Sequence, residues 1–170
     1  MEVHEAIRTM LAVRAYEDRA VPHDVVRKIV EAAHLSPSSM NKQPWHFIVV
    51  RDRDTLRTLG ALDKTGPYVA QAPLAVAVCV ERESKFAVSD ASRAIQDMML
   101  TAWAEGVGSN WAGWFGLEEV AKLLGVPAKY DVLTIIPFGY PASKAGRGKK
   151  KRKAMGEVVS GEKFDTPYVG

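Results

Sequence analysis

The feature that most constrains the fold is the unbroken apolar run PLAVAVCVE at residues 73–81. A run of this kind lacks the polar–apolar alternation of a half-exposed strand, and is typical of a strand buried on both faces of a sheet. Such a strand needs a layer of structure against each face. The sequence therefore predicts a central sheet covered by helices.

Helical and extended patterns alternate along the rest of the chain. Pro22 suits a first helical position, and Asp52 or Asp54 suits a helix cap. The predicted helices span residues 2–12, 22–34, 52–62, 90–105 and 117–125, and the predicted strands span 45–51, 73–81, 109–115 and 131–140. The 170 residues show no internal repeat and no linker, so we expect a single α+β domain over residues 1–170.

The predicted helix over residues 90–105 has an unusually wide apolar face. Ile95, Met98 and Trp103 contribute to it, and the face is too wide for a simple surface helix. Two interpretations stay open. The helix is either the core helix of a monomer or an interface helix between subunits.

The composition excludes several classes of protein. One cysteine, Cys79, rules out an internal disulfide framework and a cysteine-rich zinc site, and the four histidines show no metal-ligand spacing. No apolar run is long enough to cross a membrane, and the N-terminus lacks the basic-then-apolar order of a signal peptide. We therefore expect a cytoplasmic protein with no resident metal and no membrane partner.

The positive charge of the chain is concentrated in one segment, KAGRGKKKRK, from Lys144 to Lys153. It holds seven basic residues and no acidic one, and without it the formal net charge of +3 would become negative. A run of this kind can be a phosphate-binding segment, a solvated loop or a nucleic-acid surface. No aromatic residue interleaves the run, so we do not expect nucleic acid as a partner.

The stretch LSPSSMNKQPWHFIVV, residues 35–50, places many hydrogen-bonding side chains directly before an apolar strand. Pro37 blocks the preceding helix, and the serines and Asn41 after it suit a turn. The side chains could satisfy the turn's own backbone. Alternatively, the loop could present hydrogen bonds to a flat heterocycle that stacks on the apolar neighbours.

Residues SPSSMNKQPWHFIVV closely resemble the signature APSS-x-N-x-QPW-x-F-x-VV of the FMN-dependent nitroreductase family. The resemblance continues through VRAYEDRAVPHDVVRKIVEAAHLSPSS at the start, AIQDMMLTAWAEGVGSNW in the longest predicted helix, FGYP at 138–141, and the basic KKRK near the end. These matches cover most of the chain and follow the family's order. Together they are far more specific than any single motif.

The resemblance implies a nitroreductase-like three-layer sandwich, with a mainly antiparallel central sheet covered by helices. It also implies a homodimer that binds FMN at the subunit interface, with the tail 141–170 wrapping over the partner and the helix over 90–105 forming the dimer core. Such enzymes pass hydride from NADH or NADPH through flavin N5 to a nitroaromatic, a quinone or another small acceptor, in a ping-pong cycle. No catalytic side chain is required, because the cofactor carries the chemistry. The alternative is a flavin-binding store or sensor without efficient turnover.

The family motifs assign three groups of candidate cofactor-binding residues. The flavin's polar edge would contact Pro37, Ser38, Ser39 and Asn41. Small residues would let the backbone approach flavin N5 and O4 closely, namely Ala112 and Gly113. The FMN phosphate would be held by basic side chains, namely Arg14, Lys150 and Arg152.

One departure from the family pattern concerns the phosphate. The family's R-x-S-x-R segment aligns with residues 10–14, where Met10 replaces the first Arg and Ala12 replaces the Ser. One charge and one hydroxyl are lost, and Arg8, one helical turn from Ala12, is a candidate replacement. The residues do not distinguish NADH from NADPH, and they do not name the physiological acceptor.

Overall fold

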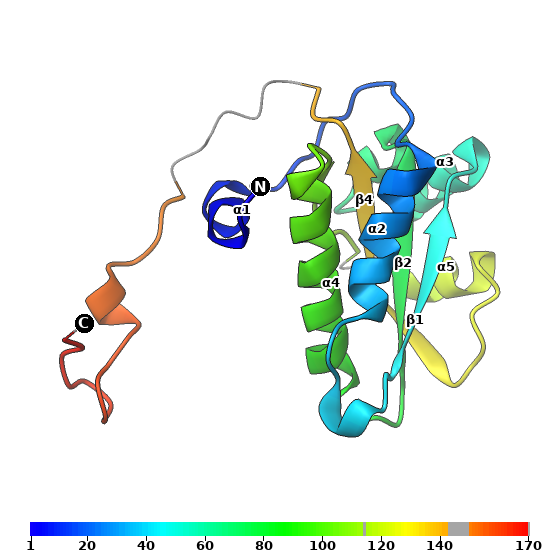
Figure 1. The fold of residues 1–170 in the computed structure, drawn as a ribbon. Helices are drawn as coiled ribbons and strands as arrows, with labels where there is room; N and C mark the ends of the chain where they lie inside the picture. Colours follow the sequence, from blue (N-terminus) through cyan, green and yellow to red (C-terminus); the bar gives the residue numbers. More distant parts are fainter. Residues whose placement is uncertain (114, 143–149, 170) are drawn as a thin grey trace.

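The computed structural model describes residues 1–113, 115–142 and 150–169 (Figure 1). Its centre is a four-stranded sheet with the order β1-β2-β4-β3, in which every neighbouring pair is antiparallel. The strands are β1 (Trp45–Val50), β2 (Leu74–Glu81), β3 (Gly108–Ser109) and β4 (Tyr130–Gly139). The predicted antiparallel sheet is confirmed.

Helices cover both faces of this sheet (Figure 1). α2 and α4 pack on one face, and α3 and α5 pack on the other. The helices are α1 (Val3–Thr9), α2 (His23–His34), α3 (Arg53–Leu62), α4 (Ala87–Ala104) and α5 (Leu117–Leu123), with short 3-10 turns at Ser39–Asn41, Pro67–Gln71 and Met155–Glu157. The three-layer α+β sandwich expected from the sequence is therefore present.

β2 is buried on both faces, as the apolar run predicts. Leu74, Val76 and Val78 pack into the cluster shared with α2 and α4. Ala75 and Cys79 point the other way, into the cluster shared with α3 and α5. This alternation follows from the two-residue period of a strand, and it makes β2 the shared wall of the two hydrophobic cores.

Several predicted bounds differ from those in the structure: the helix predicted over 90–105 begins at Ala87, the helix predicted over 117–125 ends at Leu123, and two further elements end early. The helix predicted over residues 2–12 stops at Thr9, because the following segment is extended and Ala12 pairs with Ser109 of β3. The strand predicted over 109–115 was too long. Only Gly108–Ser109 forms a ladder with β4, and Ala112 makes a single isolated bridge to Ile135.

α4 is the longest helix of the described residues, and most of its apolar face lies inside this chain. Ala91, Ala94, Ile95 and Met98 are fully buried against the sheet and α2. α4 is therefore a core helix of the single chain. Leu100, on another side of α4, lines an open groove that the core does not fill.

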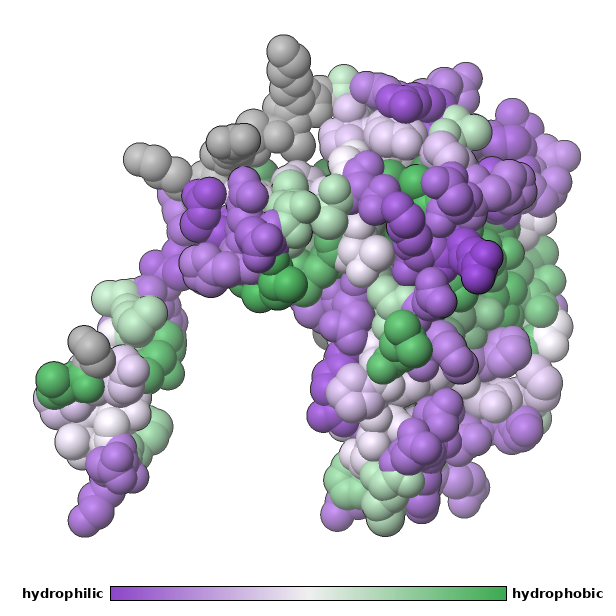
Figure 2. Space-filling model, in the orientation of Figure 1, coloured by the Kyte–Doolittle hydropathy of each residue, from purple (hydrophilic) through white to green (hydrophobic). Residues whose placement is uncertain are grey.

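Lys150, at the start of the tail 150–169, contacts Ile7 of α1, whereas the part of the tail from the turn Met155–Glu157 onward lies apart from the sheet and its helices, with an open space between them (Figures 1 and 2). Five of the tail's large apolar side chains are exposed by more than half, namely Met155, Val158, Phe164, Tyr168 and Val169. Residues 144–149 of the basic segment lie outside the described residues. The tail therefore presents apolar surface that no other described residue covers.

Candidate functional site

The polar loop, residues 36–43, connects α2 to β1 through an unusual backbone conformation. Met40, Asn41 and Gln43 all have positive φ, at 54°, 54° and 50°. The N–H of Gln43 donates to the Ser38 hydroxyl over 2.9 Å, and the Gln43 side-chain amide donates to the backbone and side-chain oxygens of Asn41 over 3.2 Å. The loop thus satisfies part of its own backbone and stands in a fixed, left-handed turn.

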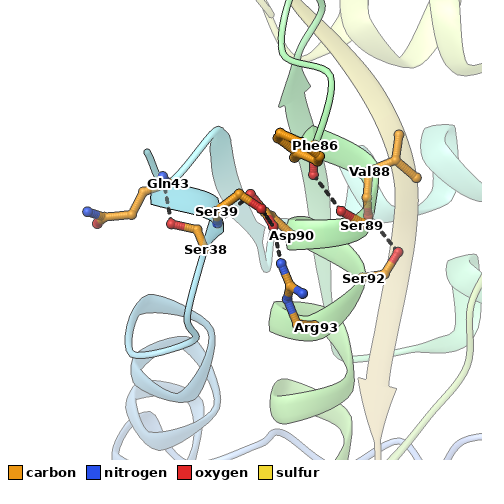
Figure 3. Close-up of polar contacts among 9 residues, drawn as sticks. All are labelled: Ser38, Ser39, Gln43, Phe86, Val88, Ser89, Asp90, Ser92 and Arg93. Carbon is orange, nitrogen blue, oxygen red and sulfur yellow. Dashed lines mark hydrogen bonds and ion pairs between the residues drawn. The ribbon is translucent and has the colours of Figure 1, made fainter. Parts of the chain in front are cut away.

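Two carboxylates of α4, those of Asp90 and Asp97, accept hydrogen bonds from this loop (Figure 3 shows Asp90). Asp90 is fully buried and accepts both the N–H and the hydroxyl of Ser39, each over 3.0 Å. Arg93 forms an ion pair with the same carboxylate. Two helical turns further along, Asp97 accepts the hydroxyl of Ser36. The loop is therefore fastened to α4 at two points.

The outer side of the polar loop faces solvent. Pro37, Met40 and Asn41 are exposed, and Ser38 is partly exposed. An open pocket of about 320 Å³ borders the loop, with Met40 and Phe86 among its lining residues. The exposed turn offers amide, hydroxyl and backbone groups to a ligand beside apolar side chains.

A second group of candidate residues gathers around the extended segment 10–14. Ala12 pairs with Ser109, and the N–H of Val13 donates to the carbonyl oxygen of Ser109 over 2.9 Å. Arg14 in this segment is exposed. The segment thus forms an edge of the sheet with a cationic side chain beside it.

One basic residue of the tail, Lys150, contacts α1, the helix that leads into segment 10–14. Lys150 donates to the carbonyl oxygen of Ile7 in the last turn of α1, three residues before Met10. Partial burial lowers the pKa of the Lys150 ammonium, and the positive charge of Arg152 lowers this pKa further. Lys150 is therefore held at the end of α1, and the charge of Arg152 is near enough to act on its ammonium group.

The segment after β3 joins this second group. Asn110 is buried and donates through Nδ2 to the Tyr68 hydroxyl over 2.6 Å. Ala112 is buried against Ile135. Gly113 has φ of +97°, and a Cβ there would lie 2.9 Å from a methyl carbon of Leu117. The backbone at residues 112–113 is accordingly compact, and a larger residue at 113 would have to adopt a left-handed backbone and displace the Leu117 side chain.

One chain does not bring the two groups together. The polar loop leads into Trp45, which pairs with Val80, and Val80 pairs with Asp131 at the start of β4. Ser109, beside the second group, pairs with Phe138 at the other end of β4. Seven residues of extended strand separate these two levels, a distance of about 24 Å.

Comparison with known proteins shows which family has this sequence and fold. The model of the nitroreductase family matches residues 7–81 and 63–140 of the chain. The chain belongs to the nitroreductase family. A protein of Methanothermobacter thermautotrophicus, provisionally named an NADH dehydrogenase/NAD(P)H nitroreductase, is 38% identical over 154 residues, which are 86% of this chain and 81% of that protein.

Other relatives carry related names. The FMN reductase of Bacillus subtilis is 24% identical, with 94% of this chain and 72% of that protein covered. The solved structure of an FMN-dependent nitroreductase from Clostridium difficile superposes with a TM-score of 0.87 at 28% identity, covering 95% of this chain and 99% of that one. This nitroreductase chain thus has both the sequence and the fold of its family.

Three residues of these groups escaped the sequence analysis. Asp90 stands on the apolar side of α4, and a carboxylate in such a position was the one available signal of a buried partner. Tyr68 and Asn110 carry no pattern that marks them, because their contact joins residues 42 positions apart. The sequence also offers Trp114 as a pocket wall or a core residue, and this residue lies outside the described residues.

The described residues contain neither a metal-binding cluster nor a membrane-spanning helix. No group of three or more His, Cys, Asp or Glu side chains is arranged to hold a metal ion in residues 1–113, 115–142 and 150–169. Over the same ranges, no helix has the length and hydrophobicity needed to span a membrane.

Proposed function

We propose that this chain is an FMN-dependent NAD(P)H oxidoreductase that acts as a homodimer. The observation that supports this most is the separation of two chemically distinct half-sites at opposite ends of the sheet. The polar loop offers hydrogen bonds to a heterocycle, and the segment 10–14 with the tail offers cations. A second copy can bring its polar loop to the first copy's cationic edge, so that each cofactor lies between two chains.

The cationic edge fits a phosphate. Arg14, Lys150 and Arg152 form no ion pair with any acidic side chain among the described residues. Cations without a counter-ion favour a bound anion, and Arg and Lys are the side chains that bind phosphate most often. Lys150 approaches from the tail and supplies a charge where Met10 and Ala12 have removed an arginine and a hydroxyl.

The polar loop fits the pyrimidine edge of a flavin. The exposed Asn41 amide and Ser38 hydroxyl can donate to ring carbonyl oxygens and accept from ring N–H. Pro37 and Ser39 shape the turn that carries them, with Ser39 tied to Asp90. On the other half-site, Ala112 and Gly113 carry no bulky side chain, which would let a flavin lie close to this segment, but both residues are buried and the N–H and carbonyl of Ala112 already bond to Ile135.

The chain's own residues would bind, orient and exclude water. Bound FMN would supply the chemistry, taking electrons from NADH or NADPH and passing them to a small acceptor such as a nitroaromatic or a quinone. The residues of both half-sites hold the ligand in place, and donors at its edge stabilise the negative charge that reduction adds. The proposed role needs no side chain as acid or base.

In the proposed dimer, the tail of one subunit would fill an apolar groove on the other subunit. An open groove of about 350 Å³ between α1, α2 and α4 is lined in part by Val3, Leu35 and Leu100. The exposed apolar side chains of the tail match such a surface. We therefore propose that residues 1–170 form one domain. Its tail, residues 141–170, would wrap over the partner subunit.

The test of the proposed function is turnover by the purified protein loaded with FMN. We expect oxidation of NADH or NADPH, followed at 340 nm, to depend on both FMN and an added quinone. FMN binding without turnover would favour the alternative of a flavin store or sensor. A protein that neither binds FMN nor oxidises the nucleotide would overturn both.

A further inference from the structure

Asp90 lies at the N-terminal end of α4, beside the polar loop and outside the set of residues that would touch the cofactor (Figure 3). We propose that Asp90 is a positioning residue for the flavin site. Through Ser39 it fixes the turn at Met40–Gln43 in the shape that presents Ser38 and Asn41 to the heterocycle. This inference rests on the proposed function.

The contacts of Asp90 are those of an anchor. Its carboxylate is fully buried, with one oxygen accepting the Ser39 N–H and the other accepting the Ser39 hydroxyl. Arg93 balances its charge. A buried carboxylate is stable only when it is paired and hydrogen-bonded, so these contacts determine its place and, through Ser39, the place of the loop.

The turn that follows Ser39 needs such an anchor. Met40, Asn41 and Gln43 adopt positive φ, which residues other than glycine seldom adopt, and of these three only Asn does so with any frequency. A strained turn persists when contacts on both sides determine it. Asp90 supplies the contacts on one side, and the Gln43–Ser38 hydrogen bond supplies the contact on the other.

The alternative role for Asp90 is general stability of α4. The two roles predict that loss of Asp90 changes hydrogen exchange in different parts of the chain. A positioning residue controls hydrogen exchange within residues 36–43 and the affinity for flavin. A residue that only stabilises the helix changes exchange throughout α4 and its neighbours without selecting the loop.

The experiment compares Asp90→Asn and Ser39→Ala with the matched control Ser92→Ala. The Ser92 hydroxyl is exposed and donates to the carbonyl oxygen of Val88 within α4, over 2.7 Å, so its removal leaves the loop untouched. Amide hydrogen exchange is followed in the full-length apoprotein, and FMN affinity is measured by quenching of flavin fluorescence. Ser39→Ala keeps the Asp90–Arg93 pair and serves if Asp90→Asn does not fold.

We expect Asp90→Asn to speed exchange in residues 36–43 and to raise the Kd for FMN by about tenfold or more, because hydrogen bonds to a charged group are lost. Ser39→Ala should shift both in the same direction by a smaller factor, and the double variant should match Asp90→Asn. Ser92→Ala should change neither.

Several results would overturn the inference. They are unchanged exchange in the loop of folded Asp90→Asn, an unchanged Kd in that variant, or effects of Ser39→Ala and Asp90→Asn that simply add. If the wild-type protein binds no FMN, the proposed function fails instead. Loop exchange in the variants would still decide whether Asp90 positions residues 36–43.

Discussion

At the scale of single residues, Gly116 combines a left-handed backbone with a lack of space. Its φ is +81°, and a Cβ there would lie 2.4 Å from the carbonyl oxygen of Leu62. Gly125 has φ of +66° but no atom within 4 Å of its Cβ position. We expect Gly116→Ala to lower the free energy of unfolding by about 3 kcal/mol, and Gly125→Ala by about 1–2 kcal/mol, the cost of the left-handed conformation alone.

Urea unfolding of the two glycine variants measures this difference directly. The pair separates steric overlap from backbone strain, since both residues have positive φ and only Gly116 approaches another backbone. Equal losses would contradict the close contact between the end of α3 and the start of α5.

Cys79 provides a second residue-scale test. It lies in β2 with its side chain in the core shared with α3 and α5, and burial raises the pKa of its thiol to about 11. The reactive thiolate is therefore scarce in the folded protein at pH 8. We expect negligible reaction with a disulfide reagent at pH 8 until denaturant is added, and then one thiol per chain. Rapid reaction of the folded protein would contradict the packing of β2.

At the scale of elements, α4 connects the two proposed half-sites within one chain. Asp90 holds the polar loop near one end, and Trp103 near the other end donates through its indole N–H to the Thr9 hydroxyl of α1 over 2.9 Å. Thirteen residues of helix separate them, about 20 Å. One rigid element thus sets the positions of the loop and of the helix that leads into residues 10–14.

The tail provides the element-scale prediction. Lys150 lies against the end of α1, and Lys163 lies further along the same tail without an ion pair among the described residues. We expect Lys150→Ala to raise the Kd for FMN by about tenfold and to leave the Kd for riboflavin unchanged, since riboflavin lacks the phosphate. Lys163→Ala is the control and should change neither. If Lys150→Ala weakened the binding of FMN and riboflavin equally, Lys150 would not be a ligand of the phosphate.

The elements predicted well from sequence are those with local causes. β2, and α2 over 22–34, follow from runs and spacings within one segment, and Asp52 caps α3 as one of two named candidates. The end of the first helix was predicted too late because its cause is distant in the sequence. The segment after Thr9 is extended where Ala12 pairs with Ser109. The link between Ser39 and Asp90 spans 51 residues, so no local pattern could have revealed it.

At the scale of the whole molecule, the account requires that each cofactor site uses two chains. Asn41→Ala would damage the polar loop, and Arg14→Ala would damage the cationic edge. In a mixed dimer of the two variants, both defects fall on one site and the other site is intact. We expect each variant alone to bind FMN poorly and an equal mixture to recover about a quarter of the wild-type flavin, since half of the dimers are mixed.

The mixture must be assembled by co-expression so that the subunits exchange. Arg14→Ala co-expressed with Lys163→Ala is the control. Its mixed dimers also have one damaged and one intact site, but Arg14→Ala alone causes the damage. An Asn41→Ala and Arg14→Ala mixture with no more flavin than the separate variants would show that the two half-sites do not form one site.

The most direct test of the central claim, that this chain is an FMN enzyme of the nitroreductase family, is the visible absorption spectrum of the purified protein with identification of what it releases on denaturation. The account predicts the two-banded spectrum of a flavin and the release of FMN. A colourless protein that also fails to take up added FMN would contradict it, and would mean that Met10 and Ala12 have removed the cofactor site despite Lys150.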